Sequence, residues 1–275
     1  MKDMVNNKTM TEAECKEEGL RVLDETDRVC KELGLQYFLA YGTLLGAIRH
    51  KGYIPWDDDI DIWMKRHDFE ILVREFNNHA RDGFKLLFHT NTPNYRCSFP
   101  KITSSRTKVK EKHLADDNST GIWVDVFVLD YVDEESRNNT GKLITLEHRR
   151  GLSLYHTADF SMKMGLICSY LFRKGTKLKD FNTPTSYFVE EMTKLHANEK
   201  YEEEMRAPIS LTDLKIMMKS RWFEESIYMP FENREYPVPV MYDELLKACY
   251  GDYMKLPSLK DQKKAQHMTD AEWIG

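Results

Sequence analysis

Four of the five residues 57–61 are aspartates, and this segment restricts the fold more than any other part of the chain. Side chains alternate between the two faces of a β-strand. An extended segment therefore places Asp59 and Asp61 on one face and turns Ile60 and Ile62 toward a core on the other. Carboxylates this close together repel one another, and a bound cation is the usual way to neutralise them. Oxygen-only ligands favour Mg²⁺ or Mn²⁺, so we expect a metal site here.

Two other interpretations of the acidic segment stay open. It could form a solvated acidic turn, although the interleaved isoleucines weigh against that. A calcium-binding EF-hand loop needs Gly at its sixth position, and counting from Asp57 that position holds Ile62. Asp57 would share the strand face of the later aspartates and assist the site indirectly.

A further acid, Asp125, stands inside the apolar run 121–129. An ionisable side chain in such a run either has a partner or faces a cleft. Asp125 could therefore complete the metal site from a neighbouring strand, or it could be a salt-bridged core residue. Asp130 follows at the end of the run, and we expect it to serve the turn.

The first half of the chain predicts a mixture of helices and strands. A capping-box pattern at Thr11 and Glu14 and apolar residues at helical spacing predict a helix over 11–33. Gly42 and Thr43 form a turn between a strand and a short helix, a place where backbone N–H groups favour phosphate. The expected strands are 36–40, 59–64, 84–89, 95–102, 106–111 and 122–129, and the other expected helices are 44–50 and one that includes 69–76.

The second half predicts mainly helices, over 140–176, 184–206 and 242–250. We therefore expect an α+β fold, with a mixed sheet, flanking helices and a mostly helical C-terminal half. The expected division is a catalytic core over 1–133 and a region over 134–275 that packs on it.

Composition narrows the classes of function. The net charge of −5 argues against general nucleic-acid binding. Five widely spaced cysteines without a C-x-x-C motif fit a reducing cytoplasm better than a disulfide framework. The chain contains no apolar run of about 18 residues that could cross a membrane. The basic stretch 142–179 could instead contact an anionic membrane face, and we expect a cytoplasmic protein that can meet the inner face of the membrane.

The longest motif, YGTLLGAIRHKGYIPWDDDIDIWM, resembles the signature of the LicD family. Members of that family move phosphocholine from CDP-choline to sugars of cell-surface glycans, and the similar fukutin relatives transfer ribitol phosphate. The resemblance extends over about residues 18–130, with a weaker similarity at 250–257 and His267. It implies a nucleotidyltransferase-like fold.

The resemblance also implies roles for single residues. Gly42 and Thr43 would lie against the donor phosphates, and Asp59 and Asp61 would hold the metal. Asp125 would be the third carboxylate, as a metal ligand or as the acceptor of the hydroxyl proton. The basic residues expected to meet the diphosphate are Arg49, Lys51 and Lys101. Aromatic faces that could receive choline are offered by Tyr53, Trp56, Trp63, Trp123 and Trp222.

The function that the sequence favours is a metal-dependent phosphotransferase. CDP-choline would donate phosphocholine to a hydroxyl of a glycan or its lipid-linked precursor, with release of CMP. The alternatives are transfer of another CDP-activated polyol phosphate, a nucleotidyltransferase that makes an activated donor, and an inactive module that binds nucleotide or glycan. No nucleic-acid partner is expected.

Overall fold

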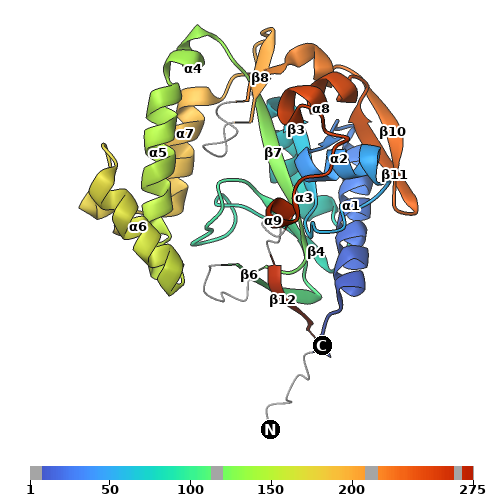
Figure 1. The fold of residues 1–275 in the computed structure, drawn as a ribbon, viewed down its shortest axis with the longest axis horizontal. Coiled ribbons are helices and arrows are strands. Elements are labelled where there is room, and N and C mark those ends of the chain that lie inside the picture. Colours follow the sequence, from blue (N-terminus) through green and yellow to red (C-terminus); the bar gives the residue numbers. More distant parts are fainter. Residues whose placement is uncertain (1–7, 113–119, 208–215, 263–267, 275) are drawn as a thin grey trace.

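The structure, a computed structural model, describes residues 8–112, 120–207, 216–262 and 268–274. Its central sheet has the strand order β2-β3-β7-β5-β4, with β8 beside β7 and β9 beside β8 (Figure 1). These strands are β2 (Phe38–Leu39), β3 (Asp61–Lys65), β4 (Phe84–Leu87), β5 (Lys101–Ser104), β7 (Trp123–Tyr131), β8 (Glu204–Arg206) and β9 (Met218–Lys219). Strands β3 and β7 run parallel, and the other neighbours are antiparallel. This mixed sheet with its helices confirms the predicted α+β class.

Helices α1 (Glu12–Leu33) and α3 (Arg66–His79) cover one face of this sheet. The predicted capping box starts α1: the Thr11 side chain accepts a hydrogen bond from the Glu14 amide, and the Glu14 carboxylate accepts one from the Thr11 amide. The helix ends at Gly34 with φ of +69°, a conformation that glycine adopts without strain. Both ends of this helix therefore follow from local sequence.

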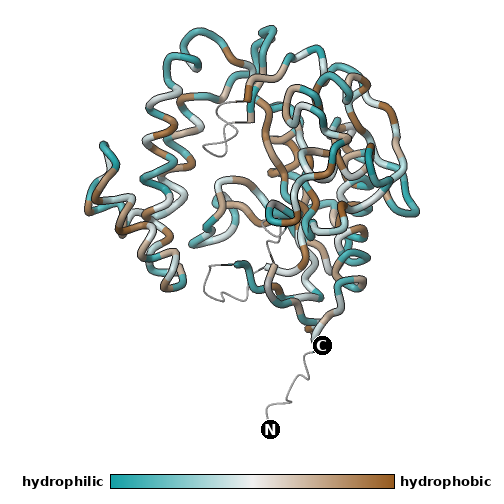
Figure 2. Tube along the Cα trace, in the orientation of Figure 1, coloured by the Kyte–Doolittle hydropathy of each residue, from teal (hydrophilic) through white to brown (hydrophobic). Residues whose placement is uncertain are grey.

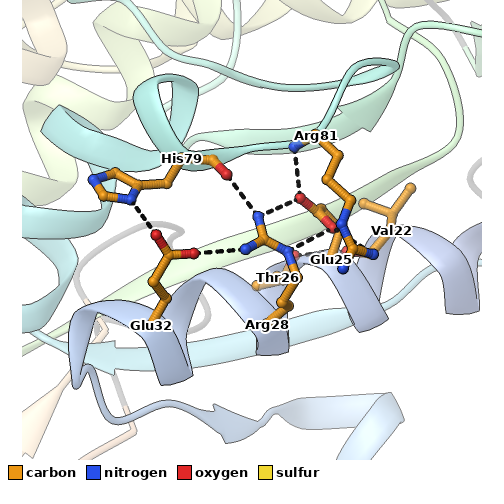
Figure 3. A network of polar contacts seen from close by, with 7 residues as sticks. All are labelled: Val22, Glu25, Thr26, Arg28, Glu32, His79 and Arg81. Carbon is orange, nitrogen blue, oxygen red and sulfur yellow. Dashed lines mark hydrogen bonds and ion pairs between the residues drawn. The ribbon is translucent and has the colours of Figure 1, made fainter.

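A polar network ties α1 to the end of α3 (Figure 3). The Arg28 guanidinium donates to Glu25, Glu32 and the backbone oxygen of His79. The His79 ring contacts Glu32 at 2.8 Å, and the Arg81 amide donates to Glu25 at 2.7 Å. These bonds fasten the two helices on the side of the sheet that lies away from the acidic segment.

Helix α2 (Tyr41–Arg49) contacts β2, β3 and the strand β10 (Ser226–Phe231). It starts three residues earlier than predicted, so Gly42 and Thr43 belong to its first turn instead of a separate turn. Strand β10 (Ser226–Phe231) pairs with β11 (Arg234–Pro239) as a hairpin beside this helix.

Several predicted strands have different bounds in the structure: the strand expected over 36–40 is only Phe38–Leu39, and the one expected over 84–89 ends at Leu87. The strand expected over 59–64 is β3, which begins at Asp61, so Asp59 lies in the preceding loop. The strand expected over 95–102 begins only at Lys101. Pro93 and Pro100 lack the N–H group that a strand ladder needs, which explains why this segment is irregular.

The second half forms a helical layer at the left of Figure 1, where α5 and α7 pack side by side and α6 packs on the outside of α5. This layer contains α4 (Glu134–Asn138), α5 (Thr140–Ser153), α6 (Phe160–Phe172) and α7 (Thr185–His196). The other two helices of the second half, α8 (Tyr242–Tyr250) and α9 (Leu259–Gln262), lie outside it, nearer to α2 and the sheet. The helix predicted over 140–176 is broken after Ser153, and the one predicted over 184–206 ends at His196 and is followed by β8. The helix predicted over 242–250 is confirmed.

The second half also supplies strands that pair with the first. Strand β12 (Met268–Trp273) lies between β1 (Lys8–Thr9) and β6 (Thr107–Glu111). Strand β8 pairs with the end of β7. The division near residue 133 stays a prediction. Across the described residues, the structure has no helix with the length and apolar character needed to span a bilayer.

Candidate active site

The candidate site is built on one row of residues across three neighbouring strands. Asp61 on β3 is paired with Asp125 on the parallel strand β7, and Asp125 is paired in turn with Lys101 on the antiparallel strand β5. Residues in register on adjacent strands point to the same face of a sheet. The sheet order therefore brings together three side chains that are far apart in the sequence.

Asp59 joins this row from the loop before β3. One carboxylate oxygen from each of Asp59, Asp61 and Asp125 lies within 4.8 Å of the others. The backbone oxygen of Ile60 accepts a hydrogen bond from the Asp125 amide at 2.8 Å, which fastens the loop against β7. Ile60 and Ile62 are buried on the other side, as the alternation predicts.

The first turn of α2 closes the site next to this cluster. The Thr43 hydroxyl oxygen accepts a hydrogen bond from the Asp61 amide at 2.9 Å. A side chain on Gly42 would overlap the Asp57 carboxylate, so the helix start and the acidic loop are in close contact. Tyr41, at the head of the helix, has φ of +40°, a strained conformation of the kind found at functional sites.

Lys101 is buried within this cluster. Its Nζ lies 3.0 Å from Asp125 Oδ1 and 3.8 Å from a carboxylate oxygen of Glu111. The same ammonium lies 3.7 Å from the centre of the Trp123 ring, whose Nε1–H donates to Asp125 Oδ2 at 3.0 Å. Both oxygens of Asp125 are therefore held by neighbours.

The electrostatics of the site show an excess of negative charge. Burial, reinforced by Asp59 and Asp125, raises the pKa of Asp61 well above its usual value. Burial also raises the pKa of Asp125, although Lys101 opposes that shift. The pKa of Asp57 rises to about 8 because of burial and the neighbouring Asp59 and Asp58 carboxylates. Burial alone would lower the pKa of Lys101, but Asp125 and Glu111 outweigh it and raise that pKa.

These residues fit a divalent cation. Three carboxylates converge, and one buried ammonium does not balance their charge, as the raised pKa values show. Hard oxygen donors in this number suit Mg²⁺ or Mn²⁺. Asp59, Asp61 and Asp125 are the residues that would hold it. A second group, Asp57, Asp58 and Asp59, lies alongside and shares Asp59 with the first.

Of the three basic residues predicted to meet the diphosphate, one lies beside the carboxylates. Lys101 lies in the cluster, whereas Arg49 and Lys51 lie at and beyond the C-terminal end of α2, the end away from Gly42. Arg49 donates to the backbone oxygen of Tyr253 at 2.7 Å, and the backbone oxygen of Lys51 accepts from the Glu232 amide. The structure does not bring these two side chains to the carboxylates. His267 lies outside the described residues.

Four aromatic rings lie next to the charged side chains of Asp61, Asp125 and Lys101. We call them the aromatic wall; they belong to Tyr41, Trp63, Phe99 and Phe127. Phe127 contacts Tyr41 at 5.2 Å and Phe99 at 4.6 Å between ring centroids, and Trp63 contacts Tyr41 at 4.7 Å. The Lys101 ammonium lies 5.7 Å from the centre of the Phe99 ring, so the wall starts at the charged row. Tyr41 and Phe99 are half-buried, while Trp63 is almost fully buried.

Three contacts of the site were not expected from the sequence. Glu111 was not among the candidate residues, and Trp123 was one of several candidate aromatics, yet both contact Lys101. The Met268 amide, from β12, donates to the Asp58 carboxylate at 3.0 Å. No local pattern signals these contacts, because each joins segments that only the tertiary fold brings together.

Asp130 corrects another expectation. It does not serve a turn: it is buried on the opposite face of β7, where it accepts two hydrogen bonds from Arg66 and contacts His196 at 2.6 Å. This group links β7 to α3 and α7, so its role in the structure is to hold the fold together.

Known proteins resemble this chain in sequence over most of its length. Residues 34–164 match the family model described as LicD/FKTN/FKRP, nucleotidyltransferase domain. The chain is 29% identical over 267 residues to the lipopolysaccharide cholinephosphotransferase LicD of Haemophilus influenzae, which covers 92% of this chain and 94% of that protein. A segment of 53 residues is 45% identical to ribitol 5-phosphate transferase FKRP of mouse and human, covering 18% of this chain and 11% of theirs. The resemblance inferred from the motif is thereby confirmed.

Proposed function

We propose that the chain, whose residues 34–164 match the LicD/FKTN/FKRP family model, is a metal-dependent phosphotransferase that moves phosphocholine from CDP-choline to a glycan hydroxyl and releases CMP. The observation that carries this proposal is the convergence of Asp59, Asp61 and Asp125 beside the buried ammonium of Lys101. The similarity to a cholinephosphotransferase over most of both chains supports the choice of the transferred group.

In this proposal the three carboxylates hold Mg²⁺ or Mn²⁺. A bound divalent cation would neutralise the donor diphosphate and stabilise the charge that develops on the departing phosphate. Asp125 acts as a metal ligand in this proposal, because one of its oxygens lies within 4.8 Å of carboxylate oxygens of Asp59 and Asp61. Lys101 keeps Asp125 ionised and oriented.

The donor would lie between the first turn of α2 and the aromatic wall. Gly42 presents backbone where a side chain would collide with Asp57, and the start of a helix attracts phosphate. A quaternary ammonium group is attracted to aromatic faces. The half-buried rings of Tyr41 and Phe99 are therefore the proposed contacts of choline.

The proposed reaction is a single displacement at phosphorus. The acceptor hydroxyl oxygen forms a bond to the phosphorus that carries choline, and the bond from that phosphorus to the bridging oxygen breaks. CMP leaves with the electron pair, and the hydroxyl proton passes to a carboxylate of the acidic segment. The residues described above act by positioning and by electrostatic stabilisation, which supply most of the rate enhancement in phosphoryl transfer.

We place the reaction in the cytoplasm, with a cell-surface glycan or its lipid-linked precursor as acceptor. Cys15, Cys30, Cys97 and Cys168 form no disulfide, which fits a reducing compartment.

The test is CMP release. Purified protein is incubated with CDP-choline, Mg²⁺ or Mn²⁺ and a lipopolysaccharide or oligosaccharide acceptor, and CMP is measured by chromatography. We expect release that depends on both metal and acceptor and that Asp61→Asn abolishes. Asp82→Asn, which changes an exposed aspartate in the turn after α3, is the matched control and should behave as wild type.

Other outcomes select the alternatives. CMP release from CDP-ribitol but not from CDP-choline would identify another polyol phosphate as the transferred group. Formation of CDP-choline from CTP and phosphocholine would indicate a nucleotidyltransferase. Binding of CDP-choline without turnover under any condition would indicate an inactive binding module.

A further inference from the structure

Helix α6 has an apolar stripe on its outward face. Phe160, Met164, Cys168 and Leu171 follow one another at intervals of four, four and three residues and are all exposed. Phe160 is 81% exposed and Leu171 is 64% exposed. Residues at this spacing lie along one side of a helix. A surface helix ordinarily turns polar residues outward, so the stripe is unusual.

The inner side of α6 is already occupied. Leu166 lies against Gly151 of α5, and the ring of Tyr170 packs on Phe181 with 5.5 Å between the centroids. Figure 1 shows α6 on the outside of α5, away from the sheet, and Figure 2 shows apolar residues along it. The outward stripe is therefore additional to the surface that packs α6 on the protein.

The apolar surface includes Phe172, the last residue of the helix, and continues beyond it at Leu178. Phe172 is 83% exposed and Leu178 is 70% exposed. Asp180 follows directly and is buried, where its two carboxylate oxygens accept hydrogen bonds from Arg149. This ion pair holds the segment after α6 in place against α5.

The same surface is positively charged. Residues 160–179 contain five cationic side chains and no carboxylate, although the whole chain is acidic. Four of them, Arg173, Lys174, Lys177 and Lys179, follow the helix and are exposed. Exposed apolar side chains beside a cluster of basic ones are typical of elements that lie in the surface of an anionic bilayer.

We propose that residues 160–179 dock the protein on an anionic lipid surface, with the α6 stripe in the acyl boundary and the lysines at the headgroups. A helix of 13 residues is about 20 Å long, which is too short to cross a bilayer but suits one lying in its surface. Electrostatic attraction and apolar burial would act together, and neither would suffice alone.

Lipid fits this surface better than a protein partner does. Protein interfaces are depleted of lysine relative to the rest of the surface. Lysine side chains bury their methylene groups while keeping their charge in water, which suits the boundary of a membrane. A second copy of the chain would bring the same cations against one another, with no carboxylate in the segment to pair with them.

The experiment is flotation of the full-length protein with vesicles. We expect binding to phosphatidylcholine vesicles that contain phosphatidylglycerol, weaker binding to pure phosphatidylcholine, and loss of binding in high salt. Leu171→Ser with Phe172→Ser should weaken binding about tenfold or more. Lys174→Gln with Lys179→Gln should weaken it about fivefold for each lysine removed.

A matched control changes exposed apolar residues elsewhere. Met254 and Leu256 are 58% and 56% exposed, so Met254→Ser with Leu256→Ser should bind vesicles as wild type does. Loss of binding in this control but not in the α6 variant would overturn the proposal. So would equal binding to neutral and anionic vesicles, or a dimer in sedimentation that Leu171→Ser with Phe172→Ser abolishes.

Two further measurements show whether a loss of vesicle binding is separate from a loss of folding or of the proposed transferase activity. Circular dichroism and thermal melting should be unchanged in the α6 variants, because the substituted side chains are exposed. CMP release with a water-soluble oligosaccharide should also be unchanged, so failure of vesicle binding and failure of the proposed transferase activity are distinguishable.

Discussion

Lys101 and Asp125 face each other across the antiparallel strands β5 and β7, with 3.0 Å between Nζ and Oδ1. Both side chains are buried, and Asp125 also lies among the carboxylates of Asp59 and Asp61. The pair therefore contributes both to the stability of the sheet and to the proposed chemistry. Its variants can be tested by measuring unfolding and activity.

The first prediction concerns this pair. Lys101→Met should destabilise the metal-free protein by about 3–5 kcal/mol, because it leaves a buried carboxylate without its cation. Asp125→Asn should lower metal affinity and turnover about a hundredfold. Combining the two should recover much of the stability but none of the activity. Urea unfolding measures the stability of the wild type, the two single variants and the double variant, and CMP release measures their activity. If the stability losses of the two single variants simply add up in the double variant, the two side chains are not coupled.

The second prediction concerns Asp61. Asp61→Asn should reduce turnover about a hundredfold or more, because the amide cannot replace a charged metal ligand. The metal-free variant should melt at the same or a slightly higher temperature, since the raised pKa of Asp61 means that its charge costs stability. Calorimetry with and without Mg²⁺ measures both effects. A variant that retains half of the wild-type rate would remove Asp61 from the site.

The third prediction is a dependence of metal-free stability on pH. The folded-state pKa of Asp57 is raised to about 8, whereas an unfolded aspartate titrates near about 3.9. The folded state therefore binds protons more tightly, and the stability from this group is lost as pH rises toward about 8. We expect the melting temperature to fall by a few degrees between pH 6 and pH 8.5.

The matching control for this pH effect is Asp57→Asn. In this variant the melting temperature should fall less between pH 6 and pH 8.5. Added Mg²⁺ should raise the melting temperature more at pH 8.5 than at pH 6, because protons compete with the metal for the same carboxylates. A melting temperature that rises with pH over this interval in the metal-free wild type would contradict the prediction.

The fourth prediction separates structure from chemistry at Asp130. Its pKa is lowered, because His196 and Arg66 outweigh the effect of burial. Asp130→Asn should cost about 3–5 kcal/mol of stability, because it replaces the buried carboxylate between Arg66 and His196 with a neutral amide. The KM for CDP-choline should not change at a temperature where the variant is folded. A large change in KM without loss of stability would place Asp130 in the active site.

The fifth prediction tests the aromatic wall. Phe99→Leu should raise the KM for CDP-choline roughly threefold to thirtyfold, because it removes a face for the quaternary ammonium while preserving apolar volume. The effect on a CDP-alcohol without a cationic headgroup should be much smaller. Tyr228→Leu, which changes an exposed ring on β10, is the control. Equal effects on both donors would argue that Phe99 only supports packing.

Local sequence determined the features that depend on neighbouring residues. The capping box at Thr11 starts α1, and Gly34 ends it, because both contacts close within one helical turn. The alternation of aspartate and isoleucine at 59–62 placed the acids on one side and the isoleucines in the core, since the geometry of an extended chain requires it. The motif likewise indicated the family and the fold class.

Only the tertiary structure decided which groups meet. Asp130 and Asp125 both lie in the apolar strand β7, yet one is held by Arg66 and His196 and the other faces Lys101 and the acidic loop. The sequence could not distinguish them, because their surroundings depend on which strands and helices pack on each face of the sheet. Arg49 is close to the acids along the chain but lies at the far end of α2, whereas Lys101 is distant along the chain and reaches them through strand register. Sheet order and register, which are set by burial over the whole chain, determine the charge balance of the site.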